Sequence, residues 1–320
     1  MAEAAASIVR IDDSAPTPPH LRGAIVALGN FDGFHLGHQA VVNRAIKWAH
    51  AEGRPAIIAT FDPHPMRLFR PDTPPFRLTT LDQRERLFGA AGADAMLVFH
   101  FTADLAAKSA EEFVAMLVDQ LGAAGVVTGE DFTFGKSRSG TVARLKELGA
   151  LLGLRAEAVP AVTDEAGETI SSSRIRAALQ SGDCAAATRL LTRPFAIEGV
   201  VQHGDKRGRT IDFHTANIAL NSYLRPAYGV YAVRARLADG RIVDGVANLG
   251  IRPMFDPPVE LLEAYFFDFS GDLYDQTIEV QLIGYIRPEA KLESLEALQA
   301  QIALDCDAAR QILGKTPRLP

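Results

Sequence analysis

Two histidines, His35 and His38, stand where an apolar run gives way to a helical pattern. The run AIVALG (24–29) is typical of a buried strand, and the stretch after the histidines has apolar residues at helical spacing. The first N–H groups of a helix lack partners and the helix dipole favours an anion, so this junction predicts phosphate binding. An isolated pair of histidines is more often a cap or a surface feature. It is also a poor zinc site, since zinc needs three or four ligands.

The residues around the histidines strengthen the phosphate interpretation. Gly29, Gly33 and Gly37 allow a ligand to approach the backbone closely, and Asp32 places an acid among them. These neighbours raise the histidine pair above a chance match.

Length and composition limit the classes of protein that need to be considered. The chain has 320 residues, which is typical of two domains, and 48% of them are hydrophobic. A net charge of −6 argues against wrapping of nucleic acid, and no apolar run reaches the length of a membrane span. The first twenty residues carry acids and prolines, which is unlike a secretory signal. The two cysteines, Cys184 and Cys306, lie far apart, which predicts no disulfide framework and fits a reducing cytoplasm.

The first half of the chain alternates strand-like and helix-like segments. This alternation predicts βαβ units and a parallel sheet with helices on both faces, whose ligands bind beyond the carboxyl ends of the strands. The loops FDPHP and GEDFTFG follow the second and fourth strands, so they share that rim with the histidine loop. Expected strands are 24–29, 55–61, 95–101, 124–129 and 155–160, and expected helices are 38–51, 81–91, 110–121 and 141–152.

A further helix starts in ISSSRIRAALQ (170–180), where Ser171 or Ser172 can serve as the cap. Arg174 and Arg176 lie in its first turns, where a cation is unfavourable for the helix dipole. They are either a solvated surface pair or, with the serine hydroxyls and open N–H groups, a grip for a polyphosphate. A shorter helix ends near Leu191.

After Arg193-Pro194 the pattern changes to short β-type runs separated by turns such as ADG and SGDLYD. This composition predicts an antiparallel barrel. The stretch 293–313 predicts a closing amphipathic helix with Leu295, Leu298, Ile302 and Ala309 on its apolar face. The predicted domains are therefore 1–191, α/β and Rossmann-like, and 192–320, an antiparallel β-barrel with a C-terminal helix.

An ordered set of motifs gives the chain a specific resemblance over residues 22–315. These motifs are GNFDGFHLGH, TFDPHP, GEDFTFGKSRSG, ISSSRIR, GVVQHGDKRGRTIDFHTANI, GVYAV, GVANLGIRP, LLEAYFFDFSGDLY and SLEALQAQIALD. In this order they resemble the family of bacterial bifunctional riboflavin kinase/FMN adenylyltransferases, also called prokaryotic FAD synthetases. The resemblance implies a cytoplasmic enzyme that converts riboflavin to FMN and FMN to FAD, with ATP as co-substrate and Mg2+ as metal.

For the first half, the resemblance implies a nucleotidyltransferase site of the HxGH type. AMP passes from ATP to the phosphate of FMN, and catalysis is mainly positioning and electrostatic stabilisation. His35, His38 and Arg176 are the implied catalytic residues, and Asp62 and Asp131 line the flavin side. The implied ATP-binding residues are Gly29, Asn30, Phe31, Gly33, Gly37, Ser172, Ser173 and Arg176.

For the second half, the resemblance implies a riboflavin kinase. Glu263 matches the catalytic base, with Glu260 as the rival three residues earlier, and Arg252 is implied in flavin binding. Thr215 and Asn217 match ligands of Mg-ATP, and their hard oxygens suit magnesium. The loop HGDKRGR can cradle phosphates. The implied ATP-binding residues are Gly204, Lys206, Gly208, Arg209, Thr215 and Asn217.

Three positions depart from the family pattern: His214 replaces a proline, and Ile251 and Met254 replace threonines. These departures keep an alternative open, an FMN adenylyltransferase whose kinase domain is weak or inactive. A flavin-binding regulatory barrel on another nucleotidyltransferase is a third possibility. The expected partners are riboflavin, FMN and ATP, with no nucleic acid or membrane, and the chain is expected to be a monomer or a weak homo-oligomer.

Overall fold

The computed structural model describes residues 8–203, 215–252, 259–291 and 293–318. Packing divides the chain into two compact units, one of residues 1–74 with 81–171 and the other of 75–80 with 172–320. Residues 172–191 therefore pack with the second unit, although the sequence assigns them to the first domain. The predicted boundary between 191 and 192 stays a prediction about function. Within the described residues, no helix is long and apolar enough to cross a membrane.

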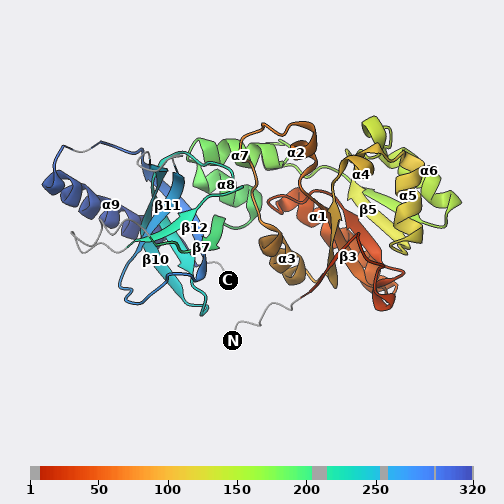
Figure 1. Cartoon of the computed structure of the whole chain (residues 1–320), viewed down its shortest axis with the longest axis horizontal. Coiled ribbons are helices and arrows are strands. Elements are labelled where there is room, and N and C mark those ends of the chain that lie inside the picture. The colour runs from red at the N-terminus through yellow and green to blue at the C-terminus, as the bar shows by residue number, and fades with distance from the viewer. Residues whose placement is uncertain (1–7, 204–214, 253–258, 292, 319–320) are drawn as a thin grey trace. The chain divides into compact units, whose positions relative to one another are not determined.

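The first unit is built on a sheet of six parallel strands (Figure 1), which confirms the predicted α/β class. The edge strand β1 escaped prediction because it is short and mostly exposed, without an apolar run. In sheet order the strands are β1 (Val9–Asp12), β4 (Ala95–His100), β3 (Ala56–Asp62), β2 (Ile25–Leu28), β5 (Gly125–Gly129) and β6 (Arg155–Val159).

Helices cover both faces of this sheet because side chains alternate along each strand. On β2, Ile25 and Ala27 pack with α1 (Leu36–Ala51) and α3 (Leu81–Ala90). Val26 and Leu28 face α5 (Ala110–Asp119) and α6 (Val142–Leu151) on the other side. Two short helices, α2 (Pro65–Phe69) and α4 (Ala103–Ala107), follow β3 and β4, and 3-10 turns lie at Pro19–Leu21 and Lys136–Arg138.

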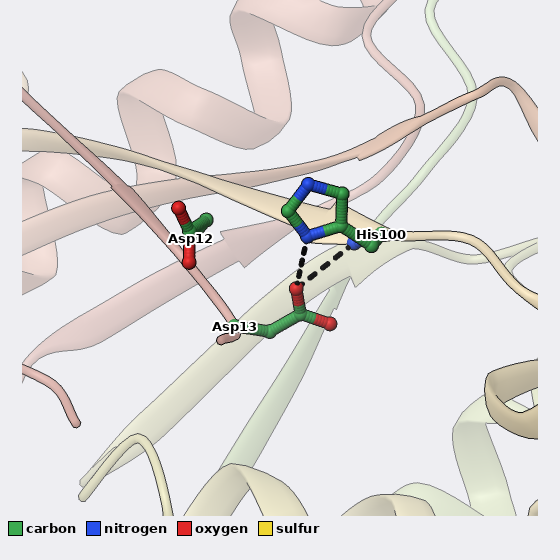
Figure 2. Close-up of side chains that lie close together, drawn as sticks. All are labelled: Asp12, Asp13 and His100. Atoms are coloured by element: carbon green, nitrogen blue, oxygen red, sulfur yellow. Dashed lines mark hydrogen bonds and ion pairs between the residues drawn. The ribbon is translucent and has the colours of Figure 1, made fainter. Parts of the chain in front are cut away.

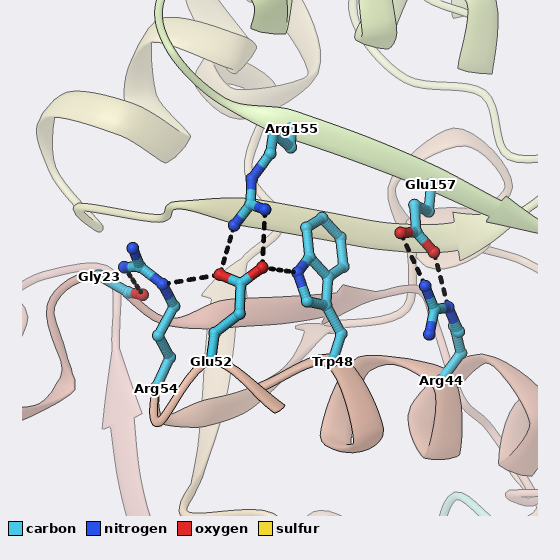
Figure 3. A network of polar contacts seen from close by, with 7 residues as sticks. All are labelled: Gly23, Arg44, Trp48, Glu52, Arg54, Arg155 and Glu157. Carbon is cyan, nitrogen blue, oxygen red and sulfur yellow. Dashed lines mark hydrogen bonds and ion pairs between the residues drawn. The ribbon is translucent and has the colours of Figure 1, made fainter. Parts of the chain in front are cut away.

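A polar network joins the end of α1 to the edge strand β6 (Figure 3). Arg155 binds Glu52 through two hydrogen bonds of 2.7 and 2.5 Å, and Trp48 Nε1 donates to the same carboxylate at 2.6 Å. One turn earlier on α1, Arg44 pairs with Glu157 at 2.6 Å. Hydrogen bonding to Arg155, followed by that to Trp48, lowers the pKa of Glu52 to about 2. The network fixes the helix that follows the histidine loop.

The second unit holds a barrel of six described antiparallel strands, as predicted. The first and last strands in the order approach each other, because Gln202 N–H donates to Asn217 O at 2.8 Å just beyond β7. The order is β7 (Phe195–Val200), β12 (Thr277–Arg287), β9 (Gly229–Arg236), β10 (Ile242–Arg252), β11 (Val259–Phe266) and β8 (Ala216–Ala219).

Among the described residues of the second unit, three helices accompany the barrel: α7 (Ser172–Gln180), α8 (Cys184–Leu191) and α9 (Leu295–Lys315). The C-terminal half of α9 packs Ala309 and its neighbours against β9, β10 and β12. The expected apolar face is wrong at the start of α9, where Leu295 and Leu298 are 54% and 37% exposed. Ile302 and Ala309 pack against the barrel core as predicted, but the first turns of this long helix extend beyond that core.

Residues 75–80 belong to the second unit although they stand between α2 and α3 in the sequence. Arg77 N–H donates to Ser222 O at 3.1 Å, and Leu224 N–H donates to Arg77 O at 2.8 Å. Arg176 of α7 donates from Nε to Phe76 O at 2.9 Å and lies over the Phe76 ring. The segment thus forms a short parallel pairing beside the barrel.

Glu52 acts as a carboxylate in its network, so its contribution to stability should depend on pH. Its folded-state pKa is depressed, and the contribution is therefore complete above pH 4.5 and lost as pH falls toward 2. Glu52→Gln should lower the Tm slightly at neutral pH, as expected for exposed ion pairs. Thermal unfolding between pH 7 and 2 should show this difference shrinking below pH 4.5. Glu165→Gln, in an exposed turn, is the control, and a difference independent of pH would contradict the assignment.

Candidate active sites

The histidine loop lies between β2 and α1, at the point where the sheet order reverses. β3 and β5 flank β2 on opposite sides, so the sheet grows in one direction from β2 to β3 and β4 and in the other direction through β5 and β6. Ligands of open α/β sheets bind at such switch points. Asp62 ends β3 and the exposed Asp131 follows β5, so both lie at the same strand edge as the loop. The three predicted polar loops therefore share one rim.

His35 is the N-cap of α1, and its Nδ1 accepts from His38 N–H at 3.4 Å. The two rings stack at 3.6 Å with their planes 20° apart. An imidazole that accepts at Nδ1 carries its proton on Nε2, so His35 can donate from that nitrogen. A Cβ on Gly37 would lie 3.1 Å from His35 Cε1, which explains the glycine between the histidines.

The loop before α1 adopts an unusual backbone. Phe31 and Phe34 have φ of 49° and 45°, and Gly33 has φ of 88°. For aromatic residues this left-handed region costs of order 1–3 kcal/mol each and persists only where neighbours hold it. Phe31 meets His38 edge to face at 5.4 Å. The loop therefore reaches the second histidine through a direct ring contact.

An apolar patch at this rim was not predicted. Met66, Leu68 and Phe69 of α2 are 38%, 37% and 67% exposed, and Phe101 contacts the Phe69 ring at 6.0 Å. Because α2 begins three residues after Asp62 ends β3, it lies at the same edge of the sheet as that carboxylate. The motif FDPHP drew attention to its polar residues, but the MRLF that follows it carries the apolar signal.

A second unpredicted cluster joins the ends of β1 and β4 (Figure 2). His100 Nδ1 lies 2.7 Å from Asp13 Oδ1, and ligand atoms of Asp12, Asp13 and His100 lie within 4.8 Å of one another. Ser14 donates its hydroxyl and its N–H to Asp12, which lowers the pKa of that carboxyl. These contacts satisfy the groups within the turn, and we assign them no metal.

The predicted phosphate-binding residues of ISSSRIR, namely Ser172, Ser173 and Arg176, lie in the first turns of α7 and so in the second unit. Ser173 is exposed, whereas Ser172 and Arg176 are half-buried. Arg176 is engaged with Phe76, as described above. Their role in nucleotide binding stays a prediction.

In the barrel, strand register brings three polar residues side by side. Glu263 of β11 pairs with Asn217 of β8 on one side and with Asn248 of β10 on the other. Residues directly opposite in antiparallel strands point to the same face. Asn217 is buried and donates to Thr215 O at 3.5 Å. Asn217, Glu263 and Asn248 therefore lie in a row across three strands, and sequence reasoning missed Asn248. Thr215 precedes Asn217 by two residues, and its role stays a prediction.

Asn248 leads to a further carboxylate that was not predicted. Its Nδ2 donates to Glu289 Oε1 at 2.9 Å, and a Cβ on Gly250 would lie 2.1 Å from the same oxygen. Gly250, the second glycine of GVANLG, therefore lets Glu289 lie against β10. Glu289 follows β12 by two residues, and no motif marked it.

The structure separates the two rival glutamates. Glu260 pairs with Arg225 at 2.5 Å and accepts a hydrogen bond from Tyr228, and Arg225 lowers its pKa below the usual range. Three residues along a strand also place Glu260 and Glu263 on opposite faces. A carboxylate that is held in an ion pair and has a lowered pKa is a poor proton acceptor. This favours Glu263 over Glu260 as the candidate base.

Several predicted kinase residues lie outside the described residues: Gly204, Lys206, Gly208 and Arg209, as do the divergent His214 and Met254. Arg252 ends β10, where its backbone pairs with Val259. Ile251 is 43% exposed and lies opposite Glu260.

Comparison with known proteins gives the same two-part division as the motifs. The FAD synthetase family model matches residues 17–174 and the riboflavin kinase model matches 191–313. Proteins named bifunctional riboflavin kinase/FMN adenylyltransferase are 38% identical in Escherichia coli K12, over 92% of this chain and 94% of that protein, and 38% identical in Bacillus subtilis, over 88% and 90%.

A solved structure from Streptococcus pneumoniae, described as a macrolide-efflux protein, is 32% identical with a TM-score of 0.84, covering 95% of this chain and 99% of that one. Its description differs from those of the curated relatives. The two family models match different parts of the sequence, one after the other, and these matches decide which family the chain belongs to. By these matches, the chain belongs to the family of bifunctional riboflavin kinase/FMN adenylyltransferases.

Proposed function

We propose that the chain makes FAD in two steps, phosphorylating riboflavin to FMN and then adenylylating FMN. The observation that carries the proposal is the presence of two separate sites in one chain. One is the HxGH junction at the switch point of a parallel sheet, and the other is a carboxylate between two asparagines in a barrel. The relatives' names describe this pair of activities. The monomeric or weakly oligomeric state and the cytoplasmic location stay predictions from the sequence.

In adenylyl transfer, a phosphate oxygen of FMN attacks the α-phosphorus of ATP. The bond from that phosphorus to the bridging oxygen breaks, and pyrophosphate leaves. His35 donates from Nε2 to phosphate oxygens, and His38 and the start of α1 add N–H donors and the positive end of the helix dipole. Catalysis is positioning and charge stabilisation, with no covalent enzyme intermediate.

The apolar patch of Met66, Leu68, Phe69 and Phe101 suits the flat ring of FMN. A flavin needs an apolar surface for its ring and polar groups for its phosphate, and this strand edge offers both. Asp62 and Asp131 lie at the same edge, as flavin- or nucleotide-binding residues.

In the kinase step, the ribityl hydroxyl attacks the γ-phosphorus of ATP and ADP leaves. Glu263 takes the hydroxyl proton as the new bond forms. Asn217 and Asn248, its neighbours across the strands, orient the carboxylate and the substrate hydroxyl. The pairing of Glu260 with Arg225 argues for Glu263 as the base.

Mg2+ fits the donors that the barrel offers. Asn217 lies opposite Glu263 across the strands and Thr215 precedes it by two residues, and their amide and hydroxyl oxygens are hard ligands of the kind that magnesium prefers. Thr215 and Asn217 would hold the ion with ATP. When bound, it supplies neutralisation of the triphosphate charge.

The two activities should separate by point mutation. His38→Ala removes a donor from the first site, and one such donor is worth about 10²–10³ in rate. FAD formation from FMN should fall by that factor while FMN formation from riboflavin continues, with products separated by chromatography. If both activities fell together in a folded protein, the two-site assignment would be wrong.

The base assignment has a matched pair of variants. Glu263→Gln should reduce kinase turnover by about 10²–10⁴ with FMN adenylylation unchanged. Glu260→Gln weakens a structural ion pair and should leave most kinase activity. The reverse pattern would transfer the role to Glu260. Formation of FMN by the unaltered chain decides against the alternative of an inactive kinase.

If the flavin ring of FMN packs on Phe69, removing that side chain should weaken FMN binding. Phe69→Ala should raise the KM for FMN about 2- to 10-fold, the range expected for one aromatic contact, and leave the KM for ATP unchanged. Leu151→Ala, which removes another exposed apolar side chain at the end of α6, serves as the control. An unchanged KM for FMN would place the flavin ring elsewhere.

A further inference from the structure

Helix α3 carries a buried arginine behind the histidine loop. Arg84 is only 3% exposed, and its Nη1 donates to Asn30 O at 3.2 Å and to Thr60 Oγ1 at 2.8 Å. Thr60 Oγ1 in turn donates to Asn30 O at 2.8 Å. The carbonyl of Asn30 thus receives two hydrogen bonds at the point where the chain leaves β2.

The same helix also holds the next part of the loop. Phe88, one turn after Arg84, is fully buried and meets the Phe31 ring at 5.9 Å and the Phe34 ring at 5.2 Å. Phe31 and Phe34 are the two residues with left-handed backbone. The hydrogen bonds of Arg84 and the ring of Phe88 therefore act on both ends of the strained segment.

We propose that Arg84 and Phe88 are positioning residues for adenylyl transfer. They hold residues 30–34 in the conformation that presents the nucleotide-binding backbone, and Phe31 transmits this constraint to His38 through its ring contact. This inference rests on the proposed function of the histidine loop. In this proposal, neither Arg84 nor Phe88 touches the substrate.

A role in simple core packing explains Phe88 but not Arg84. Taking a guanidinium out of water is unfavourable unless its donors are satisfied, and an apolar residue would fill the same space without that cost. The described donors of Arg84 reach the loop and the strand beside it. Arg84 therefore places a buried charge in direct contact with the backbone of the loop.

The test compares Arg84→Met, which keeps an apolar stem but removes the charge and the donors, with Arg84→Lys, which keeps the charge on a single donor nitrogen. For Arg84→Met we expect kcat/KM for ATP in FMN adenylylation to fall about 10- to 100-fold, the cost of misplacing reacting groups by about 1 Å. Arg84→Lys should recover part of that loss. The KM for FMN and the riboflavin kinase activity should not change. Arg144→Met, an exposed arginine of α6, is the matched control.

Two further variants separate positioning from stability. Phe88→Leu should raise the KM for ATP, whereas Leu117→Ala, a fully buried change in α5 on the opposite face, should lower Tm without that change. In the His38→Ala background, the effect of Arg84→Met should shrink, because both residues act through one loop.

Three results would overturn the inference. The first is an unchanged kcat/KM for ATP in folded Arg84→Met. The second is full additivity of Arg84→Met with His38→Ala. The third is an equal loss of adenylylation activity in Leu117→Ala, when its Tm is lowered as much as that of the Arg84 and Phe88 variants. If His38→Ala itself left FAD formation intact, the proposed function of the loop would fail instead, whatever the Arg84 variants did.

Discussion

The chemistry of the first unit depends on where and how α1 begins. Strand β2 ends at Leu28 and α1 starts at Leu36, so a few residues must turn the chain and leave helix N–H groups directed at a ligand. The turn is made with two aromatic residues in left-handed backbone, which the chain adopts only under constraint. Packing around the loop therefore sets the backbone of the proposed nucleotide site, and the Glu52 network fixes the far end of the same helix.

The second unit solves a similar problem with strand register in place of a helix start. Antiparallel pairing sets Asn217, Glu263 and Asn248 in a row across three strands. A shift of one residue in β11 would turn Glu263 away and bring its neighbours to that face. The same alternation sends Glu260 to the opposite face, where Arg225 neutralises it. Two carboxylates three residues apart thus have different partners.

The features that could be predicted from the sequence are those that leave a local periodicity or a motif. The parallel sheet, the antiparallel barrel and the HxGH junction all follow local patterns. Features that depend on distant partners were missed: β1 exists by pairing with β4, β8 by pairing with β11, and Asn248 meets Glu263 only through register. Leu295 and Leu298 had the right spacing, but spacing does not say how far a helix extends beyond its core. Arg84 gave no signal, because its burial depends on the fold.

The short segment 75–80 has a consequence for the order in which the chain can fold as it is made. Its partners around Ser222 and Leu224 are synthesised well after it. At typical rates of translation, the segment stays without them for roughly 7–30 s on the ribosome. The sheet of the first unit can form in that interval, but the stretch between α2 and α3 must stay open until the barrel strands emerge. A nascent chain halted before Ser222 would therefore carry an accessible Arg77 backbone, and proteolysis of such stalled chains would reveal it.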